Sequence, residues 1–255
     1  MMASAEFTFV TGQKTHKGHV REVNEDGLLT DDGHGVWIVA DGMGGHENGK
    51  LASQKVVSAA ETIGKAVSAP DLLARFEDRI LRANSELIDL ASREPGAVIG
   101  STVAGVLIFG RQYGCVWLGD SRVYRIRNHD IAQITRDHTE VQELLDQGAL
   151  TKHEAENWPR KNVITRAVGV FDEPLLDRKQ GELRHGDIFI VCSDGLTGHV
   201  ADQEILHYGI SKKPQEASDA LVELALKRGG HDNVTVIVIE CIERDSMNDA
   251  SKNET

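Results

Sequence analysis

Four aspartates each lie beside a different apolar run of the chain. Asp41 follows the run 36–40, Asp120 follows 115–118 and Gly119, Asp194 follows 188–193, and Asp232 comes just before 234–239. A single Asp-Gly pair is well explained as a turn, because both residues are common where a strand ends. In stacked sheets, however, strand ends can converge on one rim, so we expect the four carboxylates to gather there.

Carboxylates gathered in this way raise one another's pKa unless cations neutralise them. Mg²⁺ and Mn²⁺ prefer oxygen ligands and keep several waters, so either ion fits such a cluster. Two divalent ions would change the formal net charge from −12 to about −8. The three cysteines, Cys115, Cys192 and Cys241, lack metal-site spacing and lie in or beside apolar runs, which predicts buried thiols and no zinc site.

A second polar segment, residues 21–26, admits two interpretations. The first is a solvated, salt-bridged turn before the strand-like segment 27–30. In the second, Arg21 anchors a phosphate group through its planar guanidinium, and Asp26 or Glu25 supplies a further metal ligand.

A glycine-rich run follows Asp41. From Gly44 to Lys50 it nearly matches the G-x-x-x-x-G-K-[ST] P-loop of nucleotide hydrolases, and it lies between a predicted strand and a predicted helix. The match fails at Leu51, where a P-loop needs a hydroxyl for Mg²⁺. Asp41 is better explained as a metal carboxylate, with Gly42 lending a backbone carbonyl oxygen.

The elements that must position these residues follow from the hydrophobic pattern. Runs rich in Val and Ile predict strands at 36–40, 103–109, 115–118, 123–126, 188–192 and 234–239. Helical stripes lie at 56–67, 73–91 and 217–228, the last with Pro214 in its first turn. Two consecutive helices between runs of strands favour antiparallel sheets flanked by helices, an α+β fold, over regular βαβ alternation.

Composition narrows the class of protein. The 255 residues can form one large domain or two small ones, and the net charge of −12 disfavours a nucleic-acid or anionic-membrane surface. No stretch approaches the roughly 20 apolar residues of a spanning helix, and 1–10 lacks the features of a signal peptide, so we expect a cytoplasmic protein. Residues 135–182 are polar and irregular, which indicates a lid or insertion, and 245–255 indicate a frayed acidic tail.

Taken together, the motifs resemble those of a known family, the metal-dependent protein phosphatases (PPM, or type 2C serine/threonine phosphatases), in their compact bacterial form. The matching segments, in chain order, are Arg21…Asn24-Glu25-Asp26, 39–46 (Val-Ala-Asp-Gly-Met-Gly-Gly-His), Gly100-Ser101-Thr102, 118–122 (Leu-Gly-Asp-Ser-Arg), Asp137-His138, 192–196 (Cys-Ser-Asp-Gly-Leu) and 232–235 (Asp-Asn-Val-Thr). The resemblance as a whole spans residues 8–240. The resemblance implies a four-layer α-β-β-α sandwich in a single domain, 1–244, with 135–182 as the family's variable flap.

The resemblance also implies a role for each site residue. Asp41 would bridge two Mn²⁺ or Mg²⁺ ions, with Asp194 and Asp232 completing the first site and Asp26 and the Gly42 carbonyl serving the second. Asp120 matches the position that helps Asp194 to hold a third, weaker ion, and Arg21 would clamp the substrate phosphate. Animal members carry a His directly after the Asp-Gly, where this chain has Met43, so His46 is only a candidate for protonating the leaving group.

The function that follows is hydrolysis of phosphoserine and phosphothreonine in proteins by a metal-activated water, opposing a bacterial Ser/Thr kinase. The alternative is a catalytically inactive regulator that keeps the fold and binds phosphoproteins. The presence of Asp26, Asp41, Asp194 and Asp232 argues against that alternative, because a binding module does not need all four. We expect a monomer whose partners are phosphoproteins, without nucleic acid and without membrane insertion.

Overall fold

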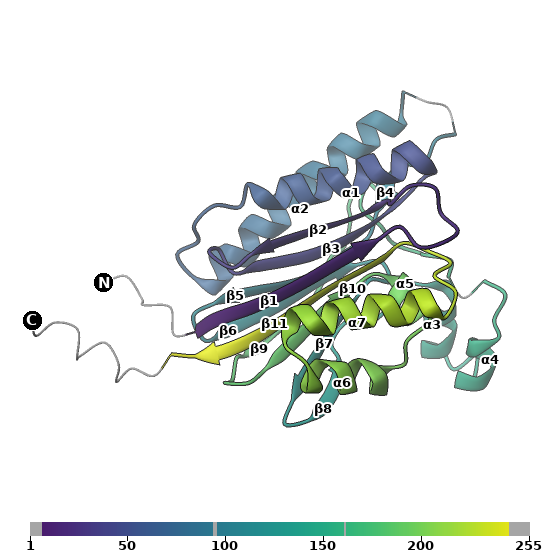
Figure 1. Cartoon of the computed structure of the whole chain (residues 1–255). Coiled ribbons are helices and arrows are strands. Elements are labelled where there is room, and N and C mark those ends of the chain that lie inside the picture. The colour runs from purple at the N-terminus through teal and green to yellow at the C-terminus, as the bar shows by residue number, and fades with distance from the viewer. Residues whose placement is uncertain (1–6, 94–95, 161, 245–255) are drawn as a thin grey trace, which may run out of the picture.

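Two antiparallel sheets packed face to face form the centre of the computed structural model, which describes residues 7–93, 96–160 and 162–244 (Figure 1). The first sheet contains, from edge to edge, β1 (Phe7–His16), β11 (Val234–Glu243), β10 (Ile188–Cys192), β7 (Arg122–Arg127) and β8 (Asp130–Gln133). The second contains β2 (Asp26–Asp31), β3 (Val36–Met43), β5 (Val103–Phe109), β6 (Gln112–Leu118) and β9 (Asp177–Glu182), with the short β4 (Gly100–Ser101) paired to β3.

Helices cover the outer face of each sheet. On the second sheet lie α1 (His46–Glu61) and α2 (Ala69–Ala91), and on the first lie α6 (Asp202–Ser211) and α7 (Pro214–Lys227), with the single turn α5 (Asp194–Thr197) beside them. The two helix layers and two sheets confirm the expected α+β, four-layer arrangement. No helix in the described part of the chain combines the length and apolar character that crossing a bilayer requires.

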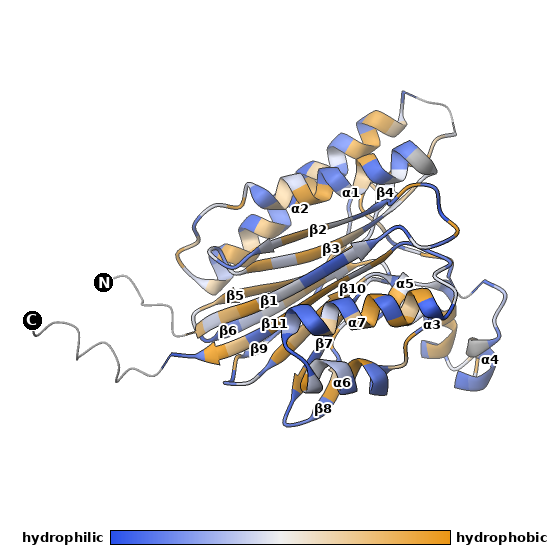
Figure 2. Cartoon of the chain, in the orientation of Figure 1, coloured by the Kyte–Doolittle hydropathy of each residue, from blue (hydrophilic) through white to orange (hydrophobic). Residues whose placement is uncertain are grey.

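Each sheet is buried on both faces, which explains why its central strands are continuously apolar. In β3, Val36, Ile38 and Ala40 pack toward α1 and α2, whereas Trp37 and Val39 point between the sheets. In Figure 2 the apolar residues of α1, α2 and α7 line the sides facing the sheets, and polar residues cover the opposite sides. The hydrophobic alternation therefore fixes which way each strand faces, and with it the position of the residue that follows the strand.

Local signals explain the ends of the helices. Ser68 caps α2 by accepting a hydrogen bond from the Asp71 N–H, and Pro214 opens α7 as expected. The first helical stripe was assigned too far along the chain: α1 ends at Glu61, and Val67 lies outside it with 79% of its surface exposed. The stripe failed because the loop residue Ile63 is also buried and so extends the apparent periodicity.

The structure adds strands that the sequence did not predict, namely β1, β4, β8 and β9. β1 was missed because it is a half-buried edge strand in which polar residues outnumber apolar ones. β9 corrects the expected flap, because residues 177–182 pair with β6 and so belong to the second sheet. Before β9, the flap contains the short helices α3 (Glu140–Asp146) and α4 (Lys152–Glu156). The expected tail, 245–255, lies outside the described residues.

Candidate metal centre

The four strand-end aspartates meet at one rim of the sandwich. Asp41, Asp120, Asp194 and Asp232 line one cavity of about 560 Å³, together with Arg21, Glu25 and Gly42. Asn162 and Ile164 of the flap also line it. The structure therefore brings together residues from four strands and the flap, as the sequence pattern predicted for the carboxylates.

The pairing of β2 with β3 places the fifth aspartate behind the cavity wall. Asp26 and Asp41 are direct partners in the register of these strands. At the next residue, Gly42, a Cβ atom would lie 1.9 Å from the Gly49 carbonyl oxygen and 2.8 Å from that of Glu25. Only glycine fits there, because the backbones of Glu25 and of Gly49 in α1 approach β3 so closely. The Gly42 N–H donates to the Glu25 carbonyl oxygen at 3.2 Å, which ties the 21–26 segment to the cavity.

Hydroxyl groups from two central strands hold the Asp26 carboxylate. Its Oδ2 accepts hydrogen bonds from Ser193 Oγ at 2.9 Å and from Thr235 Oγ1 at 2.7 Å. Its Oδ1 is buried and has no hydrogen-bond partner in the described structure. Asp26 is thus oriented by one oxygen while the other stays available.

The start of α5 and the loop before β11 supply two more carboxylates. Asp194 begins α5, and its Oδ1 is likewise buried without a hydrogen-bond partner among the described residues. Asp232 accepts from the Asn233 N–H at 2.8 Å and from Arg21 Nη2 at 2.8 Å. Arg21 therefore reaches the cavity mouth, with half of its side chain exposed (50%).

The electrostatics of the cavity are those of a site built for cations. Burial, and then the charge of neighbouring carboxylates, raises the pKa of Asp120 to about 8 and that of Asp194 to about 6. Burial likewise raises the pKa of Asp26 to about 7 against its hydroxyl donors, and it raises that of Asp41, on which the four other aspartates act. Without a cation the cluster repels itself, and a divalent ion would relieve that repulsion.

The donor set fits hard divalent ions. Buried carboxylate oxygens without partners belong to Asp26, Asp120 and Asp194, and carboxylate oxygens are the ligands that Mg²⁺ and Mn²⁺ prefer. No group of three or more His, Cys, Asp or Glu side chains among the described residues is arranged to hold a metal ion in this structure. The carboxylates form an open set, in which waters would complete the coordination of an ion.

Several supporting residues were part of recognised motifs, but the sequence did not reveal their roles. Thr102 Oγ1 accepts from the Asp41 N–H at 3.0 Å and is 2.7 Å from Ser121 Oγ. Asn233 Oδ1 accepts from the Glu25 N–H at 2.7 Å. Residues of Ser or Asn type directly after a strand-end Asp, as at 121 and 233, were the available signal.

Other candidates are placed differently. His46 begins α1, but its side chain lies outside the described residues. Lys50, the residue that suggested a P-loop, is exposed on α1 and does not line the cavity. Cys115, Cys192 and Cys241 are buried free thiols, as expected, and burial raises the pKa of Cys115 and of Cys192 to about 12.

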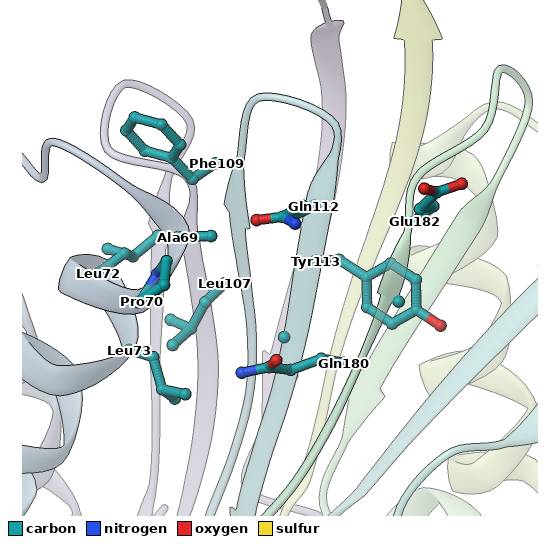
Figure 3. A pocket seen from close by; sticks show the side chains of 12 residues that line it. Ala69, Pro70, Leu72, Leu73, Leu107, Phe109, Gln112, Tyr113, Gln180 and Glu182 are labelled. Atoms are coloured by element: carbon teal, nitrogen blue, oxygen red, sulfur yellow. The ribbon is translucent and has the colours of Figure 1, made fainter.

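A second cavity, of about 340 Å³, differs in character (Figure 3). It lies between the start of α2 and strands β5, β6 and β9, near Leu107, which pairs with Val36 at the other end of β3 from Asp41. Its lining includes Leu72, Leu73 and Phe109, and Glu182 is its one acidic residue. It therefore has none of the carboxylate convergence seen at the rim.

Comparison with known proteins agrees with this geometry. Residues 14–225 match the protein phosphatase 2C family. The chain is 34% identical over 236 residues to the serine/threonine phosphatase stp of Listeria monocytogenes, covering 89% of this chain and 94% of that protein. It is 37% identical over 246 residues to the serine/threonine protein phosphatase PstP of Mycobacterium tuberculosis, covering 96% of this chain and 47% of PstP, so it spans about half the length of that relative.

Solved structures show the same fold. PppA, described as a key regulatory component of the T6SS in Pseudomonas aeruginosa, superposes with a TM-score of 0.86 at 36% identity, covering 92% of this chain and 98% of PppA. The catalytic domain of PstP in complex with two manganese ions superposes with a TM-score of 0.83 at 36% identity, covering 93% of this chain and all (100%) of that one. The chain therefore belongs to the protein phosphatase 2C family, the metal-dependent serine/threonine protein phosphatases.

Proposed function

We propose that this protein removes phosphate from phosphoserine and phosphothreonine in other proteins, using two Mn²⁺ or Mg²⁺ ions held at the carboxylate cavity. The observation that carries the proposal is the convergence of Asp41, Asp120, Asp194 and Asp232 on one cavity, with Arg21 at its mouth. The names of the relatives as serine/threonine phosphatases, and the manganese complex of one of them, support it.

The residues divide into ligands and a phosphate clamp. Asp41 would contribute to both ions, Asp194 and Asp232 would complete the first site, and Asp26 with the Gly42 carbonyl oxygen would serve the second. Asp120 and Asp194 would hold a third, weaker ion. The hydroxyls of Ser193 and Thr235 support this division, because they fix one oxygen of Asp26 and leave the other for a cation or its waters.

When bound, the two ions lower the pKa of a shared water so that a hydroxide near neutral pH can attack phosphorus. Arg21 orients the phosphate group by donating two parallel hydrogen bonds to its oxygens. Its half-exposed side chain can turn from Asp232 to the phosphate, because the described part of the chain gives it a single hydrogen bond, to Asp232 Oδ2 at the cavity mouth. His46 remains the candidate that protonates the departing serine or threonine oxygen.

The biological setting completes the proposal. The substrates are phosphoproteins, among them a Ser/Thr kinase or its targets, and residues 1–244 act as one phosphatase domain in a cytoplasmic monomer. The buried free thiols are consistent with a reducing compartment. The net charge of −12 disfavours a nucleic acid as substrate, because it would repel the phosphate backbone.

Phosphopeptide hydrolysis tests the proposal. Peptides carrying phosphoserine, phosphothreonine or phosphotyrosine are incubated with the purified chain in Mn²⁺ or in excess EDTA, and released phosphate is measured. We expect release from phosphoserine and phosphothreonine in Mn²⁺ and none in EDTA or from Asp41→Asn. A folded wild-type protein that binds these peptides but releases no phosphate at any Mn²⁺ concentration would instead identify the inactive regulator.

A further inference from the structure

His138 lies at the neck of the flap. Its N–H donates to the Gly119 carbonyl oxygen at 2.9 Å, and its own carbonyl oxygen accepts from the Thr165 N–H at 2.8 Å. Thr139 and Ile164 form a β-bridge immediately beyond it. The chain therefore leaves the sandwich for the flap at His138 and returns beside it, at Thr165.

The imidazole ring of His138 makes a second pair of contacts, to Gly119 and to Asp177 at the start of β9. Its Nδ1 accepts a hydrogen bond from the Gly119 N–H at 3.1 Å, and its Nε2 lies 3.2 Å from Asp177 Oδ2. Since Nδ1 must be unprotonated to accept, the proton of the neutral ring is on Nε2, which donates to Asp177. Burial lowers the pKa of His138 and keeps the ring in this neutral form, despite the opposing effect of Asp177.

Neighbouring side chains leave the ring little freedom. The indole of Trp117 stacks on it at 6.4 Å between ring centroids and 23° between planes, and the indole N–H is held by the Arg136 carbonyl oxygen at 2.9 Å. His138 is only 6% exposed. Arg166, on the returning side of the flap, is 3.5 Å from the other oxygen of Asp177.

Gly119 links the ring of His138 to the carboxylate of the next residue, Asp120. Its φ is +109°, and a Cβ there would lie 2.6 Å from Cγ2 of Thr102, the residue that holds the Asp41 N–H. The peptide of Gly119 is therefore fixed on one side by Thr102 and on the other by both the backbone and the ring of His138. The next residue is Asp120, whose buried Oδ1 has no hydrogen-bond partner in the described structure.

We infer that His138 is a positioning residue that couples the flap to Asp120, by holding the Gly119 peptide between the cavity and Asp177. The inference rests on the proposed function, because the coupling matters only if Asp120 is a metal ligand. The ring does not touch substrate or ion in this account; it acts only through Asp120. A change in the neck of the flap would then alter the weakest metal site, leaving Asp41 and Asp232 in place.

Metal binding measured by calorimetry tests whether His138 acts through Asp120. We expect His138→Phe, which keeps the ring shape but removes both nitrogens, to weaken the weakest Mn²⁺ step about tenfold, as removal of an orienting group typically does. In an Asp120→Asn background the same substitution should have no further effect, since the two residues act as one unit. The matched control is His185→Phe, because His185 Nδ1 also accepts a backbone N–H, that of Glu243 at 3.2 Å, in the turn between β9 and β10.

The outcomes separate this inference from the proposed function. A wild-type chain that binds no Mn²⁺ contradicts both. Wild-type binding that His138→Phe leaves unchanged, or a loss of equal size with and without Asp120, overturns the coupling alone and assigns His138 a purely structural role.

A spectroscopic measurement does not depend on the folding of the His138 variant. Long-range ¹H–¹⁵N NMR spectra of the metal-free wild type should show the Nε2–H tautomer of His138, because Nδ1 accepts the Gly119 N–H. Asp177→Asn, which keeps an acceptor oxygen for the Nε2–H, should show the same tautomer. The Nδ1–H tautomer in the wild type would overturn the inference.

Discussion

The ionisable carboxyl group of Asp120 should destabilise the metal-free protein. Its pKa is raised from 3.8 to about 8, so at pH 7 the folded state holds a proton that the unfolded state has released. At pH 7, about three units above the unfolded pKa of 3.8, keeping Asp120 protonated in the folded state costs about 4 kcal/mol of stability, at 1.36 kcal/mol per unit. Asp120→Asn keeps the shape and removes the ionisation, so it should raise the free energy of unfolding by up to that amount.

Thermal unfolding in excess EDTA at pH 7 measures this gain. For a chain of this length about 4 kcal/mol corresponds to a rise in Tm of about 8–16 °C. Asp219→Asn is the matched control, because Asp219 is 40% exposed and pairs with Lys14 at 3.4 Å on the surface. That exposed pair should contribute no more than about 1 kcal/mol.

In saturating Mn²⁺, the Tm of the wild type should be equal to or higher than that of Asp120→Asn. Ligand binding to the folded state stabilises the wild type more than a variant that lacks a ligand. A lower Tm for Asp120→Asn than for the wild type in EDTA would refute the reasoning. So would a gain no larger than that of Asp219→Asn.

Further perturbations test the other parts of the site. In EDTA, the free energy of unfolding should fall as pH rises from about 4 to 8. The raised pKa values of Asp26, Asp120 and Asp194 mean that the folded state binds more protons than the unfolded state in that window. Urea titrations at a series of pH values measure this, and a free energy that rises with pH would contradict it. Asp194→Ala should abolish Mn²⁺-dependent turnover and leave circular dichroism unchanged and the metal-free Tm equal or higher; near-normal turnover at saturating Mn²⁺ would remove Asp194 from the ligands. Arg21→Ala should raise KM for a phosphopeptide about tenfold with a smaller effect on kcat, the loss of about 1.4 kcal/mol of binding; an unchanged KM would return Arg21 to a salt bridge with Asp232.

Patterns local in the sequence predicted most of the fold. The six apolar runs all became strands, and α7 begins at Pro214, because these elements bury both faces or carry a strong terminal signal. β1 and β9 escaped prediction because an edge strand buries less and carries more polar residues, and its identity depends on a partner far away in sequence. The Asp26–Asp41 register likewise depends on pairing that no local pattern contains.

The residues of the candidate site could be predicted from the sequence, but the hydrogen bonds that orient them could not. Strand-end aspartates pointed to a rim, and the rim exists at the cavity. The hydroxyls that orient Asp26 come from Ser193 and Thr235, more than 160 residues away in the chain, and no spacing rule links them to it. The same holds for the ring of His138 beside Gly119, since the contact depends on how the flap returns to the sandwich.

Mn²⁺-dependent hydrolysis of p-nitrophenyl phosphate tests the central claim most directly. The wild type and Asp41→Ala are assayed across a Mn²⁺ titration and in excess EDTA, with folding of both checked by circular dichroism. The account predicts wild-type activity that saturates with Mn²⁺, vanishes in EDTA and is absent from Asp41→Ala at every concentration. Metal-independent hydrolysis, or no hydrolysis by a folded wild-type protein at any Mn²⁺ concentration, would contradict it.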